Sequence, residues 1–118
     1  IDFPESQQSY DMTTGNDGNL YYLSATANSM TLYKIEDDKL QSVTSPFNGT
    51  IYNPQLAFCG NVPYVMYQDN DYILHLCRWN EQSDSWTECF TGTETAQYKD
   101  ITSDGSKIYF TYTKGSDT

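Results

Sequence analysis

Three stretches of this chain repeat one pattern, in which a glycine is followed four positions later by a tyrosine. The pairs are Gly18 with Tyr22, Gly60 with Tyr64, and Gly105 with Tyr109. Successive tyrosines are 42 and 45 residues apart. A sequence period in the forties indicates an array of similar supersecondary units. The repeat therefore constrains the architecture of the chain more than it constrains its chemistry.

Each copy of the repeat predicts a meander of short strands. Short runs that are rich in Tyr, Val, Ile, Thr and Trp and bounded by Gly, Asn, Asp and Ser are strand and hairpin signals. The first strands precede the repeated glycines, at 10–14, 54–58 and 99–103. Third and fourth strands are expected at 30–35 and 40–43 in the first copy and at 73–79 and 86–90 in the second. Units of this kind at this period are typical of β-propeller blades.

The second strand of each copy is almost continuously apolar, at 20–23, 62–67 and 108–112. A sheet with one wet face alternates apolar and polar residues, whereas a sheet covered on both faces does not. Blades that stack face to face around an axis have both faces covered. We therefore predict an all-β chain that forms a partial β-propeller, built of four-stranded antiparallel meander blades. A β-sandwich or an open meander is the alternative.

The second copy resembles the blade repeat of bacterial secreted and surface β-propellers. The resemblance is carried by Gly60-Asn61-Val62-Pro63-Tyr64-Val65, by a strand that ends in Cys77-Arg78-Trp79-Asn80, and by Ser85-Trp86. The first copy matches less well, with Leu40 in place of the late tryptophan, and the third matches through its first two strands. The resemblance implies a rigid, usually non-catalytic platform outside the cytoplasm.

A chain of 118 residues is too short for a closed ring of such blades. Propellers have four to eight blades, so a ring of this repeat needs roughly 180 residues or more. We assign residues 1–118 to one domain, with blade 1 at about 8–46, blade 2 at about 52–92 and an incomplete blade 3 at about 97–118. The expected partners are the remaining blades, from the same longer protein or from other copies of the chain, because open blade faces leave apolar surface exposed.

The charge balance excludes some classes of partner. Sixteen acidic residues against six basic residues give a net charge of −10. Nucleic acids and anionic membranes both require a positive protein face, so neither is an expected partner. The sequence has no apolar run of membrane-spanning length and starts at Ile1 rather than Met, which indicates a processed start. We expect an extracellular or cell-surface location, with no insertion into a membrane.

Three cysteines allow an inference about the second copy. A hairpin turning about Ser83 places Cys77 opposite Cys89. The two preceding hairpins place Cys59 and then Cys77 opposite Val62, which puts all three thiols in one row. Only Cys77 and Cys89 then lie on adjacent strands, so they are the disulfide candidate, in an oxidising compartment. The alternative is that all three are small core residues.

Other candidate sites carry weaker signals. Asn48 begins the only N-glycosylation sequon and falls in the connector between the first two copies. Asp69 and Asp71 share one turn and are weak calcium candidates, although a polar turn chosen for its backbone geometry is the favoured interpretation. His75, the only histidine, lies inside an apolar strand and is expected to pack between blades rather than act as a base. No other metal site and no cofactor is predicted.

Two classes of function follow from these patterns. The favoured one is a non-catalytic extracellular module that acts as a rigid binding, adhesion or assembly platform for a protein or glycan. Its eleven tyrosines are compatible with a lectin-like surface, although packing between blades explains most of them. The alternative is a fragment of a propeller-type glycan-processing enzyme whose active site lies mostly outside this chain. No catalytic residue is assigned.

Overall fold

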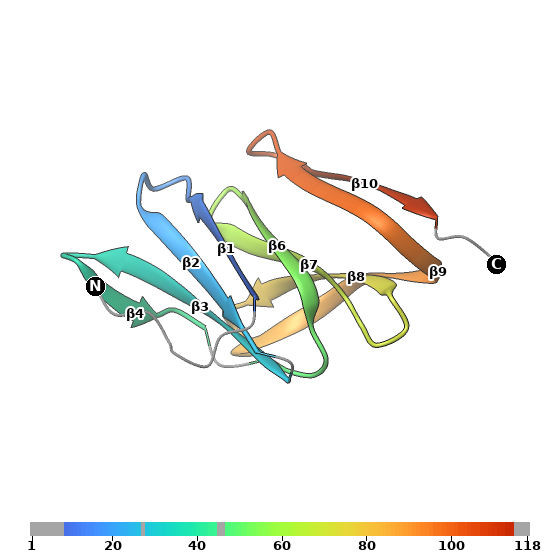
Figure 1. The fold of residues 1–118 in the computed structure, drawn as a ribbon. Helices are drawn as coiled ribbons and strands as arrows, with labels where there is room; N and C mark the ends of the chain where they lie inside the picture. The colour runs from blue at the N-terminus through green and yellow to red at the C-terminus, as the bar shows by residue number, and fades with distance from the viewer. Residues whose placement is uncertain (1–8, 27, 45–46, 115–118) are drawn as a thin grey trace.

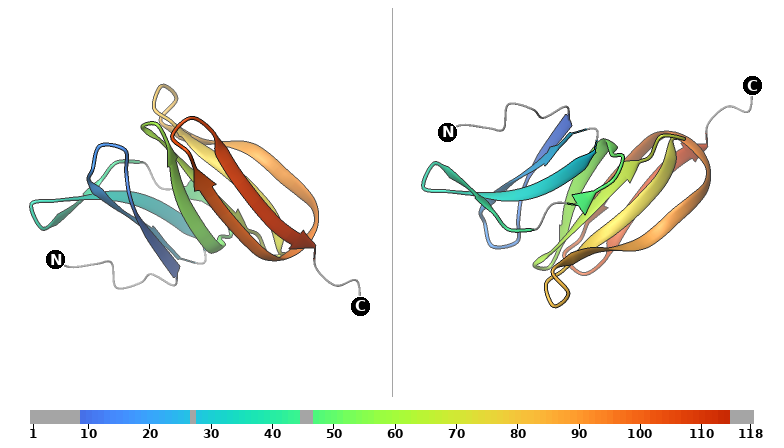
Figure 2. Two further views of the ribbon diagram at one scale, coloured as in Figure 1. Left: turned by 90° about the horizontal axis from the view of Figure 1, so that it is seen from above. Right: turned by 90° about the horizontal axis from the view of Figure 1, so that it is seen from below.

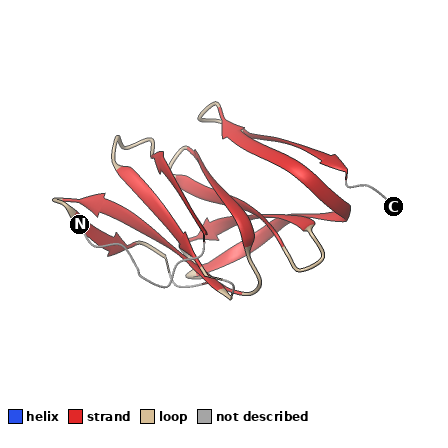
Figure 3. Ribbon diagram, viewed as in Figure 1, coloured by secondary structure: helices blue, strands red, loops and turns tan. Residues whose placement is uncertain are grey.

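The computed structural model describes residues 9–26, 28–44 and 47–114. Within these ranges it has ten β-strands and no helix, and every strand pair is antiparallel (Figures 1 and 3). It follows that no described helix is long and apolar enough to cross a membrane. The predicted all-β class and antiparallel pairing are therefore confirmed.

The first sheet contains the first copy of the repeat. Its strands are β1 (Ser9–Thr14), β2 (Leu20–Ala25), β3 (Ser29–Glu36), β4 (Lys39–Ser42) and β5 (Phe47–Asn48). The order is β1-β2-β3-β4, and β5 pairs with the start of β3. The hairpin between β3 and β4 turns at Asp37 and Asp38, which have φ angles of 52° and 59°. Two adjacent positive φ angles are typical of a type I′ turn, for which aspartate is well suited.

The second sheet contains the second and third copies. Its strands are β6 (Tyr52–Cys59), β7 (Val62–Gln68), β8 (Ile73–Asn80), β9 (Ser85–Ser103) and β10 (Ile108–Lys114). They follow the order β10-β9-β8-β7-β6. The first part of β9, up to Thr95, pairs with β8, and the rest pairs with β10. β9 is therefore shared between two hairpins.

The length of β9 corrects the prediction of separate strands at 86–90 and 99–103. The structure has one strand of 19 residues there. The intervening segment contains Thr91, Thr93 and Thr95 and lacks Pro, Asn and Asp. β-Branched threonines favour extended backbone, and no turn-forming residue other than Gly92 interrupts them. The third copy thus continues from the second without a break in the strand.

The strands form three packed layers (Figure 2). One face of the β6–β9 sheet packs against the first sheet, through a buried cluster that includes Leu23, Leu32 and Val65. Its other face packs against the hairpin formed by the end of β9 and β10, through a second cluster that includes Met66 and Leu76. Val65 and Met66 are neighbours on β7 and are both fully buried. The continuous apolar run of this strand therefore has the predicted explanation, because both faces of the sheet are covered.

The cross-strand register shows how the three copies correspond. Thr13 lies opposite Tyr21, Ala57 opposite Tyr64, and Thr102 opposite Tyr109. The counterpart of Tyr64 and Tyr109 in the first copy is therefore Tyr21, and the choice of Tyr22 from its spacing to the glycine is wrong. The first turn has five residues between its paired ends, whereas the other two have two and four. An odd loop length exchanges the two faces of the strand that follows.

Candidate functional site

The first strands of the three copies lie side by side. β1 contacts β6, and β6 contacts β9, so the blue, green and red hairpins stand in a row in the left view of Figure 2. One position is equivalent in all three strands. It is occupied by Asp11 opposite Leu23, by Gln55 opposite Met66, and by Asp100 opposite Thr111. A polar side chain at this position therefore stands at each layer boundary.

These polar side chains connect each first strand to the next. Oδ2 of Asp11 accepts the backbone N–H of Leu56 at 2.8 Å. Nε2 of Gln55 donates to Oδ1 of Asp100 at 3.4 Å. Because β6 is an edge strand, its outward amide would otherwise need water or another partner. The row of side chains satisfies that amide and fixes the relative position of the layers.

Lys99 strengthens the second of these contacts. Its Nζ donates to Oε1 of Gln55 at 2.8 Å and to the backbone carbonyl of Met66 at 3.3 Å. Burial lowers the pKa of Lys99 to about 8, although the charges of Asp11 and Asp100 act in the opposite direction. The amine thus links the first strand of the third copy to both strands of the hairpin of the second copy.

The repeated tyrosine is held by an aspartate in the preceding turn. Oδ2 of Asp17 accepts the hydroxyl of Tyr21 at 2.8 Å, and Oδ2 of Asp104 accepts the hydroxyl of Tyr109 at 3.4 Å. The hydrogen bond from the Asn19 backbone is the main reason that the pKa of Asp17 falls to about 2, with Tyr21 contributing. Backbone hydrogen bonds from Ser106 and Lys107 likewise lower the pKa of Asp104. The same local structure therefore holds the first and third tyrosines.

The environment of this tyrosine differs between the copies. In the first copy, the rings of Tyr21 and Phe58 pack with centroids 4.6 Å apart, and burial raises the pKa of Tyr21 to about 12. In the second copy, Tyr64 packs against the cluster formed with the β9–β10 hairpin. In the third copy, Tyr109 is 51% exposed. Each tyrosine faces the layer that follows its own, and the third has an open surface there.

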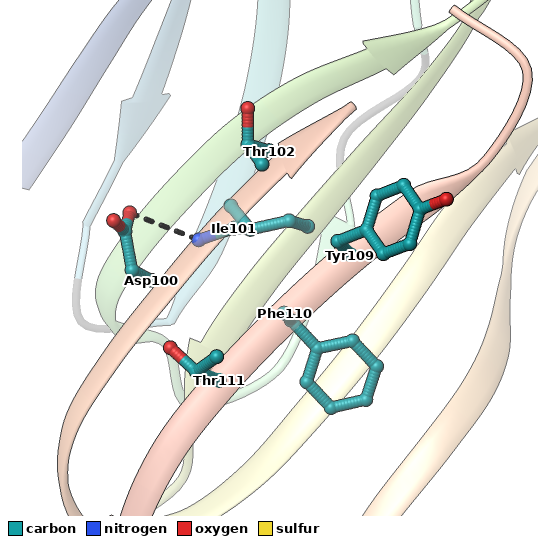
Figure 4. A pocket seen from close by; sticks show the side chains of 6 residues that line it. All are labelled: Asp100, Ile101, Thr102, Tyr109, Phe110 and Thr111. Atoms are coloured by element: carbon teal, nitrogen blue, oxygen red, sulfur yellow. Dashed lines mark hydrogen bonds between the residues drawn. The ribbon is translucent and has the colours of Figure 1, made fainter. Parts of the chain in front are cut away.

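Figure 4 shows the surface around Tyr109, a hollow of about 150 Å³ on the β9–β10 hairpin. Its lining residues are Asp100, Ile101, Thr102, Tyr109, Phe110 and Thr111. Ile101 and Phe110 point into the core of the second sheet, where they pack against its buried residues. Cross-strand pairing puts the other four on the opposite face, where all are exposed. This face is one candidate binding surface.

A second candidate surface surrounds His75. Nε2 of His75 bonds to Oδ2 of Asp69 at 2.8 Å, and Nδ1 bonds to Oε1 of Glu88. Burial by itself lowers the pKa of His75, but the bonds to Glu88 and Asp69 outweigh it and the net direction is upward. The ring also stacks on Tyr67 at a centroid distance of 5.1 Å. With a carboxylate at each nitrogen, the imidazole is held as a cation and is not available as a base.

The two carboxylates respond to His75. The hydrogen bond from His75 is the main cause of the lowered pKa of Glu88. For Asp69, burial acts to raise the pKa, but the bonds from His75 and from the backbone of Asp71 and Ile73 outweigh it, so the pKa is lowered. Sequence reasoning placed His75 within a packed strand but missed this cluster, because its partners come from a turn and from the facing strand.

A pocket of about 320 Å³ adjoins His75. Its lining residues are Phe47, Gly49, Thr50, Tyr67, Asp69, Asn70, Asp71 and His75. The calcium candidates Asp69 and Asp71 lie here, but Oδ1 of Asp69 accepts the backbone N–H groups of Asp71 and Ile73. Within the described residues, no group of three or more His, Cys, Asp or Glu side chains could hold a metal ion. Asp69 therefore serves the turn and His75.

The cysteine register departs from the prediction. Cys59 lies opposite Val62 as expected, but Cys77 faces Val65, because the turn between β7 and β8 is longer than two residues. On the other side Cys77 pairs with Glu88, since a β-bulge at Cys89 shifts the register. The placement of Cys77 opposite Cys89 is therefore wrong, and all three cysteines are free in the structure. Cys77 is buried and Cys89 is exposed.

Asn48, the glycosylation candidate, lies in β5 opposite Ser29 and is exposed, as its place in a connector predicted. The residues that sequence reasoning missed are those of the layer boundaries, Asp11, Gln55 and Asp100. A signal for them existed, since a polar residue precedes the central apolar residue of the first strand in every copy.

Comparison with known proteins adds no family to this geometry. The sequence matches no protein-family model, and no curated protein is significantly similar to it. The functional argument therefore depends on the residues of the chain and their arrangement.

Proposed function

We propose that this chain is part of a β-propeller-type array and acts as a non-catalytic extracellular platform for binding, adhesion or assembly. The observation that carries the proposal is the packing of the first strands β1, β6 and β9 in one row, joined by Asp11 and Gln55. Blades of a propeller pack in this manner, with their first strands nearest the axis. In this proposal the blades divide at about 8–46, 52–92 and 97–118, and β9 spans the last boundary.

Rigidity is the property that such a platform needs. Each of the two layer boundaries has its own buried apolar cluster. Each boundary also has polar contacts between first strands, which fix the register that apolar packing alone leaves free. The remaining blades, from a longer protein or from other copies, are the expected partners of the outer layers.

The pocket beside His75 is the proposed ligand-binding surface of the platform. Phe47 and Tyr67 supply aromatic surface, and Asp69, Asn70 and Asp71 supply polar groups along one turn. Aromatic rings beside hydrogen-bonding side chains suit a glycan or a polar protein segment. A catalytic role is disfavoured, because both nitrogens of the only histidine are engaged by carboxylates.

A glycan array probed with the purified chain tests this function. Saturable binding to one sugar class, weakened by Asp71→Ala and unaffected by Asp37→Ala at the distant β3–β4 turn, is the expected result. An array without binding would remove the glycan and leave proteins as the ligand class. Cleavage of a glycan by the chain would contradict the proposal and support the glycan-processing alternative.

A further inference from the structure

The contact between the first two copies shows which residues of the hairpin face the next layer. On β1 and β2 these are Asp11, Thr13, Tyr21 and Leu23, which share one face by their cross-strand pairing. Asp11 accepts the N–H of Leu56, Tyr21 packs on Phe58, and Leu23 is fully buried. The contact thus combines one backbone hydrogen bond to a carboxylate with aromatic and aliphatic packing.

The equivalent face of the third copy has the same residue types in the same order. Asp100, Thr102, Tyr109 and Thr111 replace the four residues of the first copy. Oδ1 of Asp11 accepts the N–H of Met12 at 2.9 Å, and Oδ1 of Asp100 accepts the N–H of Ile101 at 2.9 Å. The two aspartates therefore have the same local conformation, with Oδ2 directed to an outside partner in the first copy.

That outside partner has no counterpart at the third copy among the described residues. None of them donates a hydrogen bond to Oδ2 of Asp100, and no ring packs on Tyr109 as Phe58 packs on Tyr21. Tyr109 is 51% exposed, and Figure 4 shows it beside Asp100 and the two threonines. The face is formed like a docking surface and has its acceptor and its ring free.

We propose that this face of the β9–β10 hairpin binds a further β-hairpin of the same repeat type, with Asp100 accepting a backbone N–H from its first strand. The inference rests on the proposed function and names the partner of its outermost described layer. The ring of Tyr109 packs on an apolar residue at the position of Phe58.

The chemistry of the bound strand follows from which amides are free. The N–H groups of Met12 and Ile101 are held by the carboxylates of the residues before them, Asp11 and Asp100. Leu56 follows Gln55, which has no carboxylate, and its N–H is the one that bonds across the layers. The partner hairpin therefore carries an uncharged residue at the position of Gln55. A second copy presenting β1 would place Asp11 toward Asp100, and the like charges would repel.

The test uses the isotope-labelled full chain and a head-to-tail cyclised peptide with the sequence of residues 52–68, the β6–β7 hairpin. Cyclisation is needed because an isolated hairpin is only marginally stable. Cross-strand NOEs between Leu56 and Val65 establish the peptide's fold before titration. The expected result is a saturable shift of the backbone resonances of Thr102, Tyr109 and Thr111 in the chain.

Matched variants separate the docking contact from general effects. Asp100→Asn is expected to weaken the binding of the peptide roughly tenfold, the usual size of one hydrogen bond to a charged group. Tyr109→Ala should weaken it similarly. The controls are Asp37→Asn and Tyr72→Ala, which change exposed residues on other turns. A peptide with Gln55→Asp should also bind more weakly, because its own carboxylate holds the amide.

Several outcomes would overturn the inference. They are no saturable shift on β9–β10, equal affinity for the Asp100→Asn chain, or self-association of the chain through this face without peptide. Hydrogen exchange at the Leu56 amide in the same samples tests the stacking of the first two copies independently. Slow exchange there, with no peptide binding, would refute the docking inference and leave the proposed array intact. Rapid exchange would contradict the array itself.

Discussion

The β1–β2 and β9–β10 hairpins present corresponding faces, and only the first of these faces is covered. Leu23 is fully buried against the second sheet, whereas its counterpart Thr111 is exposed. Tyr21 packs on Phe58, whereas Tyr109 is 51% exposed. The comparison teaches that the repeat sets which side chains face the next layer, and that the presence of that layer sets how much each contributes to stability.

The largest difference is expected for Leu23→Ala against Thr111→Ala. Removing a fully buried leucine leaves a cavity and should lower the free energy of unfolding by about 2–5 kcal/mol. Trimming an exposed threonine should change it by less than about 0.5 kcal/mol. Urea denaturation followed by tyrosine and tryptophan fluorescence measures both. Equal losses would mean that the two hairpins have equivalent surroundings in solution.

The tyrosines offer a second comparison of the two faces. Tyr21→Ala removes a ring packed on Phe58 and a hydroxyl bonded to Asp17, so a loss of about 2 kcal/mol is expected. Tyr109→Ala should cost less than about 0.5 kcal/mol in the chain alone. The same denaturation experiment measures both, with Tyr72→Ala as the exposed control. A large loss at Tyr109 would show that its face is covered in the free chain.

The aspartates distinguish hydrogen bonding from packing. Asp11→Asn keeps the shape of the side chain but removes the charge that strengthens the bond to the Leu56 amide, so about 1 kcal/mol is expected. Exchange of that amide should become faster, as observed by NMR in deuterated water. Asp100→Asn should leave it unchanged. An unaltered rate in Asp11→Asn would rule out the bond as a link between layers.

The smallest effect is expected from pH, and it should originate in the central sheet rather than in either hairpin. The pKa of His75 is raised above its ordinary 6.5, so its contribution is complete below that pH and is lost as pH rises through the folded pKa. Asp69 and Glu88 have pKa values below their ordinary 3.8 and 4.5, so theirs is lost as pH falls.

Stability from this cluster is therefore greatest between about pH 4.5 and 6.5. The amplitude should be below about 1 kcal/mol, because the carboxylates are partly exposed to solvent. His75→Gln should flatten the dependence of the melting temperature on pH across this window. Asp37→Asn is the control and should leave it unchanged. A rise in melting temperature of the wild-type chain from pH 6.5 to 8 would contradict the argument.

The sequence by itself determined the strands and the layers that they form. Its apolar runs and turn residues predicted an all-β antiparallel chain, and the run 62–67 predicted a strand covered on both faces. It also predicted the pairing of Cys59 with Val62, because the two-residue turn at Gly60 fixes that register. These features are local, since they depend on residues that are close in the chain.

Only the tertiary structure decided the features that depend on how distant strands meet. The bulge at Cys89 moves it away from Cys77, and the odd length of the first turn makes Tyr21 the counterpart of Tyr64. The cluster of His75, Asp69 and Glu88 forms only when a turn and a facing strand converge. A one-residue change in a turn or a bulge moves a side chain to the other face of a sheet, and composition and spacing do not record that change.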